Sequence, residues 1–178
     1  LDTEGLTLGG TEYLAVLHHT VAGQPPTVQP TIELAIQEAC RMGIGEGWVQ
    51  SAHDCAEGGL AIALAESCLS GDCGADIRLA LDSSQADHRW DKLLFGESGG
   101  RISVSVLPNQ APAWEAYLSS QLGNDWSRLG QVGDRGEPLR LLTSDGKALI
   151  DVDVDDMSDR WRNAIPRRMA QLSQSTSV

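Results

Sequence analysis

Helix-like and strand-like segments follow one another along this chain without strict alternation, and no other feature constrains its fold as much. Apolar residues recur at helical spacing in residues 31–43, 58–71, 86–95, 111–122 and 155–172. Strand-like runs cover residues 48–52, 74–81, 101–107, 126–132, 139–143 and 148–154. The turn at residues 144–146 predicts a hairpin between the last two runs. This mixture predicts a mixed sheet that carries helices, in an α+β or three-layer α/β/α domain.

Proline marks the expected start of the folded domain. Residues 24–30 are rich in proline, which fixes φ and donates no hydrogen bond, so this stretch should be an extended linker. We therefore expect a lead-in and linker in residues 1–30, one domain in residues 31–172 and a flexible tail in residues 173–178. Because the chain begins with Leu1 rather than methionine, we also expect it to be a piece of a longer polypeptide.

The charge balance excludes some classes of partner. The chain has 13 Lys and Arg residues against 25 Asp and Glu residues, a formal charge of −12, which argues against binding to nucleic acid or to anionic membranes. Its four cysteines form no C-x-x-C pair, and no signal peptide or membrane-length apolar run is visible. We therefore expect reduced thiols in a cytoplasmic protein. A zinc site at Cys68 and Cys73 is disfavoured, because zinc needs four ligands and no second pair is present.

Residues 96–100 fit the G-x-S-x-G pattern of a hydrolase nucleophile elbow, with Ser98 as the nucleophile. That elbow needs a strand before the serine and a helix after it, whereas here a helix-like segment precedes Ser98 and a strand follows. The elbow's fold also requires a histidine after the serine. All histidines of this chain come earlier: His18, His19, His53 and His88. We therefore do not expect Ser98 to be a nucleophile.

The segment from His53 to Gly59 is expected between a strand and a helix. Its glycines let the backbone approach a ligand closely, and free N–H groups at a helix start favour phosphate. The carboxylates of Asp54 and Glu57 can supply oxygen ligands for Mg²⁺ on a nucleotide, and His53 can orient either partner. The same carboxylates stand three residues apart, the spacing of a capping box, so helix capping is an open alternative.

The loop at residues 96–101 has a similar ambiguity. Its glycines allow a tight path with positive φ before the following strand. Glu97 and Arg101 flank it with opposite charges. One interpretation is a structural loop that an ion pair closes. The other is a ligand-binding loop in which Glu97 contacts a metal or an amine.

Four segments together resemble one family in order and spacing: residues 8–14, 51–66, 93–101 and 129–133. They are similar to the C-terminal part of phosphoribosylformylglycinamidine synthase II, and the resemblance covers about residues 6 to 170. It implies a three-layer α/β/α fold, partly ferredoxin-like, as in the C-terminal domain of aminoimidazole ribonucleotide synthetase. The family reaction uses ATP, Mg²⁺ and ammonia from glutamine to convert formylglycinamide ribonucleotide to its amidine.

The resemblance also implies roles for particular residues. In the whole enzyme this domain is the second of two copies, and the first copy binds Mg²⁺ and substrate at the matching loops. By internal duplication, Asp54 is the candidate Mg²⁺ ligand, and Glu97 with Ser98 is the candidate substrate contact. Two residues depart from the pattern: Gly99 stands where the binding copy has Gln, and Glu57 replaces the more usual Asp. The candidates for nucleotide or substrate binding are His53, Asp54, Glu57, Gly58, Gly59, Glu97, Ser98 and Arg101.

No catalytic residue is expected in this chain, because the family's catalytic histidine and main ATP residues lie in amino-terminal parts. The resemblance implies an auxiliary ADP or ATP site or a scaffold. The expected partners are the N-terminal domains of the same polypeptide, a glutaminase subunit and a small bridging subunit, and self-association of the piece is an open question. The alternatives are a non-catalytic packing module and a domain of another synthetase or kinase of the same superfamily.

Overall fold

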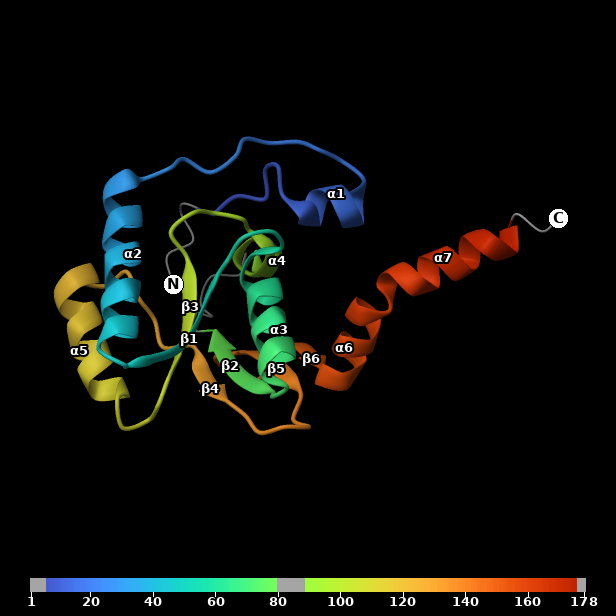
Figure 1. Ribbon diagram of the computed structural model, residues 1–178. Coiled ribbons are helices and arrows are strands. Elements are labelled where there is room, and N and C mark those ends of the chain that lie inside the picture. Colours follow the sequence, from blue (N-terminus) through green and yellow to red (C-terminus); the bar gives the residue numbers. More distant parts are fainter. Residues whose placement is uncertain (1–5, 80–88, 176–178) are drawn as a thin grey trace. The chain divides into compact units, whose positions relative to one another are not determined.

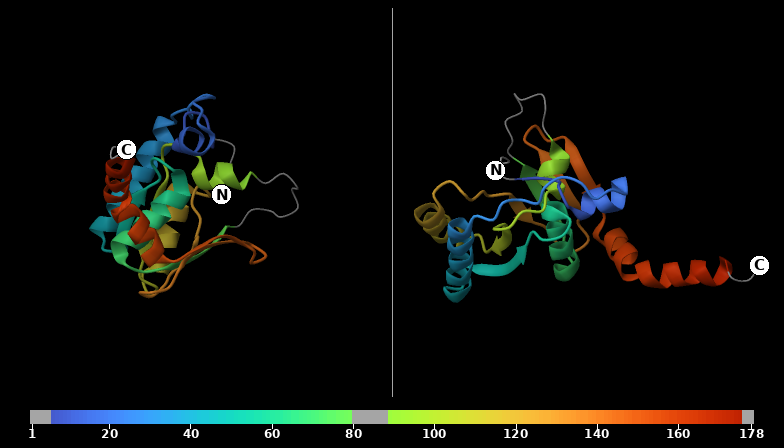
Figure 2. Two further views of the ribbon diagram at one scale, coloured as in Figure 1. Left: turned by 90° about the vertical axis from the view of Figure 1, so that its right-hand side faces the viewer. Right: turned by 90° about the horizontal axis from the view of Figure 1, so that it is seen from above.

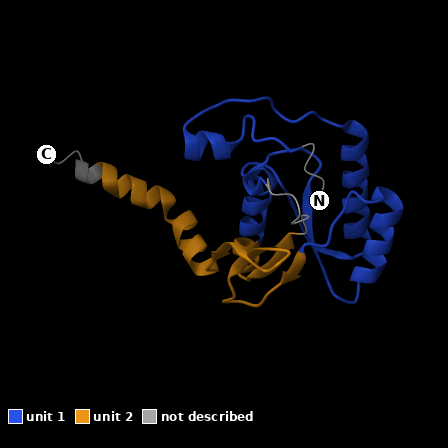
Figure 3. Ribbon diagram, turned by 180° about the vertical axis from the view of Figure 1, so that it is seen from behind, with its two compact units in different colours: residues 1–67, 80–129 blue, residues 68–79, 130–178 orange. Residues whose placement is uncertain are grey.

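The chain divides into two compact units, which are described separately (Figure 3). The computed structural model describes residues 6–79 and 89–175, with side chains as far as residue 172. Unit 1 comprises residues 1–67 and 80–129, and unit 2 comprises residues 68–79 and 130–178. Parts of the expected strand 74–81 and helix 86–95 lie outside the described residues.

Unit 1 contains a two-stranded antiparallel sheet with helices around it (Figure 1). Its strands are β1 (Val49–Asp54) and β3 (Ile102–Val106). Its helices are α1 (Glu12–His18), α2 (Pro30–Gly45), the larger part of α3 (Gly59–Gly71), α4 (Trp90–Phe95) and α5 (Ala111–Leu122). Helices α2 and α5 run next to each other (Figure 1, Figure 2).

One buried cluster of unit 1 lies where α2 and α5 meet the sheet. Ala39 of α2, Val49 of β1 and both Trp114 and Leu118 of α5 form one buried cluster. Trp48 packs beside it, with its ring centroid 6.1 Å from that of Trp114. Burial of such large side chains is the main stabilising term of a domain of this size. This core holds α2 against the sheet that carries both candidate loops.

Unit 2 is built on a four-stranded mixed sheet in the order β4-β2-β5-β6. The strands are β2 (Ala75–Leu79), β4 (Gly130–Val132), β5 (Leu139–Thr143) and β6 (Ala148–Val152). Strand β2 runs parallel to β5, whereas the β2–β4 and β5–β6 pairs are antiparallel. The alternating buried side chains of β2 and β5 form its core: Ala75, Ile77, Leu79, Leu139 and Leu141. The predicted α+β class with a mixed sheet is therefore confirmed.

Three sequence predictions of elements need correction. The expected lead-in contains helix α1, which begins at the buried N-cap Thr11 and was missed because it has only seven residues. The expected strand 126–132 is reduced to β4, because β2 offers ladder partners only to residues 130–132 and Trp126 packs on the core of unit 1 instead. The expected last helix is two helices, α6 (Val154–Arg162) and α7 (Ala164–Ser175).

The break between α6 and α7 has a clear cause in the sequence. Pro166 has no N–H to donate to the carbonyl four residues earlier, so a continuous helix would lose that bond, while proline is tolerated in the first turn of a new helix. Asn163 ends α6, and its N–H donates to the Asp159 carbonyl at 3.1 Å. Across the described residues, we find no helix with both the length and the apolar character needed to cross a bilayer.

Candidate functional site

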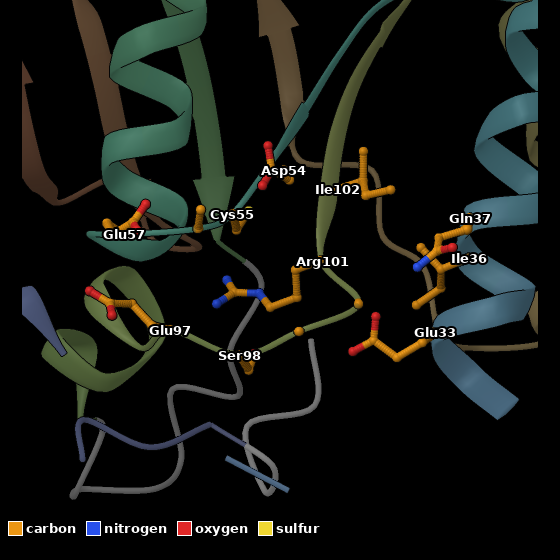
Figure 4. Close-up of a pocket in the computed structure, with 13 residues that line it drawn as sticks. Glu33, Ile36, Gln37, Asp54, Cys55, Glu57, Glu97, Ser98, Arg101 and Ile102 are labelled. Carbon is orange, nitrogen blue, oxygen red and sulfur yellow. The ribbon is translucent and has the colours of Figure 1, made fainter. Parts of the chain in front are cut away.

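The two glycine-rich loops of unit 1 meet in one pocket of about 580 Å³ (Figure 4). Asp54 and Glu57 come from the loop after β1, and Glu97, Ser98 and Arg101 come from the loop before β3. The loops meet because β1 and β3 are antiparallel neighbours, so that Asp54 at the end of β1 pairs with Ile102 at the start of β3. The structure therefore brings together five of the residues that the sequence singled out.

Helix α2 supplies the opposite side of the pocket, which the sequence analysis missed. Glu33, Ile36 and Gln37 face the loops across the cavity (Figure 4). Their spacing of three and four residues places them on one face of a helix, and this could be predicted. Which loop that face meets depends on the packing of α2 on β1, for which the sequence carries no local signal.

His53 does not contact the pocket in which it was expected to orient a ligand. Its Nδ1 lies 2.8 Å from the Asp54 carbonyl oxygen, and its Nε2 lies 3.3 Å from Oε2 of Glu66 on α3. It is not among the residues that line the pocket. The imidazole thus links β1 to α3.

The structure does not support helix capping by Asp54 or Glu57. In the part of the chain that the structure describes, neither carboxylate makes a recorded hydrogen bond to an amide at the start of α3, and the Asp54 side chain is 77% exposed. The amide of Gly58 donates instead to Oε1 of Glu97 at 2.8 Å. Both loop carboxylates of residues 54 and 57 are therefore available to a ligand.

The backbone conformation at residues 58 and 59 requires glycine. Both have positive φ, of 77° and 66°. A Cβ on Gly59 would lie 2.7 Å from the Gly96 carbonyl oxygen and 2.9 Å from that of Leu94. The two loops therefore contact each other backbone to backbone, an approach that only glycine allows.

Glu97 does not form an ion pair with Arg101, which was one of the two interpretations of this loop. No such ion pair is found between these two described residues. Oε1 of Glu97 accepts from the amide of Gly58 at 2.8 Å and from the amide of Glu12, the first residue of α1, at 2.9 Å. A carboxylate stabilises helix starts because the first N–H groups lack partners and carry the positive end of the dipole.

Arg101 is half-buried, and its guanidinium donates hydrogen bonds to carbonyls at the end of α4. Its Nη1 donates to the Gly96 carbonyl at 3.0 Å, and its Nη2 donates to that of Leu93 at 3.4 Å. Burial lowers the pKa of the Arg101 guanidinium from its ordinary value, with a smaller opposite effect of Cys55. Burial likewise raises the pKa of the Cys55 thiol, which makes this cysteine a poor nucleophile.

The pocket is acidic, with the carboxylates of Glu33, Asp54, Glu57 and Glu97 against one guanidinium. It therefore suits a cation, or an anion that brings a cation with it, better than a free phosphate. Among the described residues no group of three or more His, Cys, Asp or Glu side chains could hold a metal alone. Magnesium sites in proteins usually take one or two carboxylates, with substrate phosphates and waters as the other ligands.

Ser98 lacks the surroundings of a nucleophile. It follows α4 and precedes β3, the reverse of a nucleophile elbow, and no histidine is found among the described residues that line the pocket. The prediction that it is a loop residue agrees with this geometry.

These features define an α+β domain with a mixed sheet and an acidic pocket between two glycine-rich loops. Residues 2–139 match the family described as AIR synthase related protein, C-terminal domain, and the chain belongs to this family.

Curated relatives support a closer relationship. The chain is 53% identical over 164 residues to phosphoribosylformylglycinamidine synthase subunit PurL of Nostoc sp. strain PCC 7120, covering 92% of this chain and 21% of the relative. It is 51% identical over 168 residues to the same subunit of Synechocystis sp. strain PCC 6803, covering 94% and 21%. The predicted resemblance is confirmed. The chain spans about a fifth of the length of these relatives.

Solved structures show the same fold. Thermotoga maritima PurL complexed with ADP matches 86% of this chain and 24% of its own length, with a TM-score of 0.63 and 20% identity. The same protein complexed with FGAR matches 74% and 22%, with a TM-score of 0.62 and 22% identity. Hydrogenase maturation protein HypE matches 85% and 54%, with a TM-score of 0.55 and 15% identity.

Proposed function

We propose that this chain is the C-terminal domain of a phosphoribosylformylglycinamidine synthase. That enzyme is an ATP-dependent ligase of purine biosynthesis, which converts formylglycinamide ribonucleotide and glutamine-derived ammonia to formylglycinamidine ribonucleotide. The observation that carries the proposal is the 53% identity to a PurL subunit over 92% of the chain. The same identity favours this ligase over another synthetase or kinase of the superfamily.

Within that enzyme, the domain contributes an auxiliary nucleotide site rather than catalytic groups. Asp54 and Glu57 are the residues that would hold Mg²⁺, since both line the pocket and neither accepts a hydrogen bond from a backbone amide of residues 6–79 or 89–175. Mg²⁺ held there would offset the charge of the nucleotide phosphates. Ser98 and the glycine backbone beside it would contact the nucleotide. Solved complexes of T. maritima PurL with ADP and with ATP support nucleotide binding as the family's chemistry.

The partners follow from the same proposal. The domain packs against N-terminal domains of the same polypeptide and works in the cytoplasm with a glutaminase subunit and a small bridging subunit. A structure of PurLQS from T. maritima, which shares the fold with a TM-score of 0.61, supports such an assembly.

A second candidate function is a packing module without a ligand. Two observations favour it: Oε1 of Glu97 is engaged by two amides, and the Arg101 guanidinium donates to two carbonyls. Both charged groups thus have structural partners inside the unit.

Calorimetric titration of the 178-residue chain with ADP and ATP separates the two candidates. The auxiliary site predicts saturable binding of one nucleotide that needs Mg²⁺ and disappears with a chelator. Absence of binding at saturating nucleotide would leave the packing module. An assay of the chain alone with substrate, ATP and ammonia should show no product, because the resemblance places the family's catalytic histidine in amino-terminal parts of the enzyme. Turnover that survives repurification would refute this division of roles.

A further inference from the structure

The carboxylate of Glu97 joins three segments that are far apart in the sequence. Its Oε1 accepts one hydrogen bond from the amide of Gly58, in the loop before α3, and one from the amide of Glu12, at the start of α1. Glu97 itself lies in the loop between α4 and β3. A single oxygen atom therefore fixes α1 and the loop that carries Asp54 and Glu57 relative to each other.

Few other hydrogen bonds restrict the backbone of the loop around Gly58, between β1 and α3. The amide of Gly59 donates to the Ala56 carbonyl at 3.1 Å, which closes the turn, and Gly58 and Gly59 have positive φ. Successive glycines leave a backbone with wide conformational freedom unless hydrogen bonds restrict it. The bond from Gly58 to Glu97 supplies that restriction, and it lies one residue beyond Glu57.

The first residue of helix α1 donates to the same carboxylate. The helix has seven residues, none of them buried, and helices this short are marginal without tertiary contacts. Its contacts include the N-cap of Thr11, the stacking of Tyr13 on Phe95 at 4.9 Å between centroids, and the bond from Glu12 to Glu97. At its C-terminal end, the Thr20 amide donates to the Leu14 carbonyl at 3.2 Å.

We propose that Glu97 is a positioning residue: it acts on the ligand through the Gly58 loop and α1, not through contact with nucleotide, substrate or metal. Its Oε1 is already shared by two amides, and charge-assisted bonds of this kind are about twice as strong as neutral ones. This inference rests on the proposed function, because it assigns Glu97 a different part in the same pocket. It replaces the substrate contact that the family resemblance implied for this residue.

The test compares Glu97→Gln and Glu97→Ala with Glu57→Gln in the 178-residue chain. Glutamine keeps an acceptor oxygen but removes the charge, whereas alanine removes both. Glu57→Gln removes a charge from the same pocket without removing the acceptor of either amide. It therefore shows how the Mg·ADP affinity changes when a ligand contact alone is lost. Two quantities are measured: the affinity for Mg·ADP by calorimetry, and the hydrogen exchange of the Glu12 and Gly58 amides by NMR.

We expect Glu97→Gln to keep most of the Mg·ADP affinity and to protect both amides. Glu97→Ala should expose both amides and lower the affinity about 10- to 100-fold, the usual effect of removing a group that orients a ligating one. Glu57→Gln should lower the affinity while both amides stay protected.

The inference is overturned if Glu97→Gln loses as much affinity as Glu97→Ala while both amides stay protected, because charge contact with the ligand would then be its role. It is also overturned if Glu97→Ala binds Mg·ADP as tightly as the wild type. If the wild type binds no Mg·ADP, the proposed nucleotide site fails, and exchange alone decides the positioning role. Exposure of both amides in Glu97→Ala then supports that role, and unchanged exchange refutes it.

Discussion

Gly59 is the residue at which the two loops of the pocket touch. Its φ of 66° is strained for any side chain, and an added Cβ would meet two carbonyl oxygens. We expect Gly59→Ala to lower the free energy of unfolding by about 2–4 kcal/mol, the sum of a left-handed backbone and a steric clash. Chemical denaturation measures this.

Gly45 is the matched control for this prediction. It lies at the end of α2, has no positive φ, and nothing lies within 4 Å of an added Cβ. Gly45→Ala should change stability little or raise it by about 0.5–1 kcal/mol. Equal effects of the two substitutions would show that the loops do not approach as closely as described.

Cys68 gives a pH dependence with a definite sign. Burial, and to a lesser extent Cys73, raise the pKa of its thiol from 9.0 to about 11. A raised folded-state pKa means that the unfolded state loses its proton first. The stabilising contribution is therefore complete below pH 9 and is lost as the pH rises toward 11.

We expect the free energy of unfolding of the wild type to fall between pH 9 and pH 11 more steeply than that of Cys68→Ala. Urea denaturation across this range measures both free energies of unfolding. In their difference, the contributions of the other titrating groups cancel. Parallel pH curves for the two proteins would show that the thiol is not buried in its protonated form.

The hairpin of β5 and β6 is the element that was easiest to predict. Gly146 has a φ of 87°, as a tight turn requires, and the Thr143 amide donates to the Lys147 carbonyl at 2.9 Å. The Thr143 hydroxyl accepts from the Lys147 amide at 3.0 Å and donates to the Asp145 carboxylate. The bond from Thr143 lowers the pKa of the Asp145 carboxyl from its ordinary value.

Thr143→Val should cost about 1 kcal/mol of stability, because the Lys147 amide loses an acceptor. It should also raise the pKa of Asp145 toward its ordinary value, because the largest cause of the lowering is removed. A depressed carboxyl pKa stabilises the fold above the unfolded pKa and loses that effect as the pH falls, so the variant should lose less stability in acid. NMR titration of Asp145 checks the shift, and an unchanged pKa would show that Thr143 does not donate to it.

Other elements show which features of the fold can be predicted from the sequence and which cannot. The alternation in β5 and the helical spacing of α2 and α5 depend on local periodicity, and their type was predicted correctly. The length of β4 depends on its partner β2, and the first amide of α1 donates to Glu97, a residue far away in the sequence. Such non-local contacts leave no periodic signal.

At the scale of the whole molecule, the same limit applies to the site. The sequence placed Asp54, Glu57, Glu97, Ser98 and Arg101 in two loops, and the β1–β3 pairing brings those loops into one pocket. It could not show that Glu97 and Arg101 are engaged by backbone groups, because both residue types equally suit a ligand. It also could not show that α2 completes the pocket.

Exposed apolar side chains at the C-terminal helices predict self-association. Trp161 is 63% exposed and Ile165 is 73% exposed. Apolar patches on soluble proteins commonly mark interaction surfaces. We expect sedimentation velocity to show concentration-dependent association that strengthens at high salt, because salt screens the net charge of −12.

Replacing both residues, Trp161→Gln and Ile165→Gln, should weaken that association, whereas the control Gln171→Ala on α7 should not. A wild type that stays monomeric at all concentrations would contradict the prediction. Association of the double variant as strong as that of the wild type would also contradict it.

Asp54 is the residue through which the pocket is proposed to retain a magnesium nucleotide. The measurement is calorimetric titration of wild type and Asp54→Asn with Mg·ADP. Asp54 caps no helix, so the variant should be as stable as the wild type within about 0.5 kcal/mol. It should nonetheless bind Mg·ADP at least about tenfold more weakly, because the anionic oxygen ligand is gone. A stable Asp54→Asn variant with unchanged Mg·ADP affinity would contradict the account.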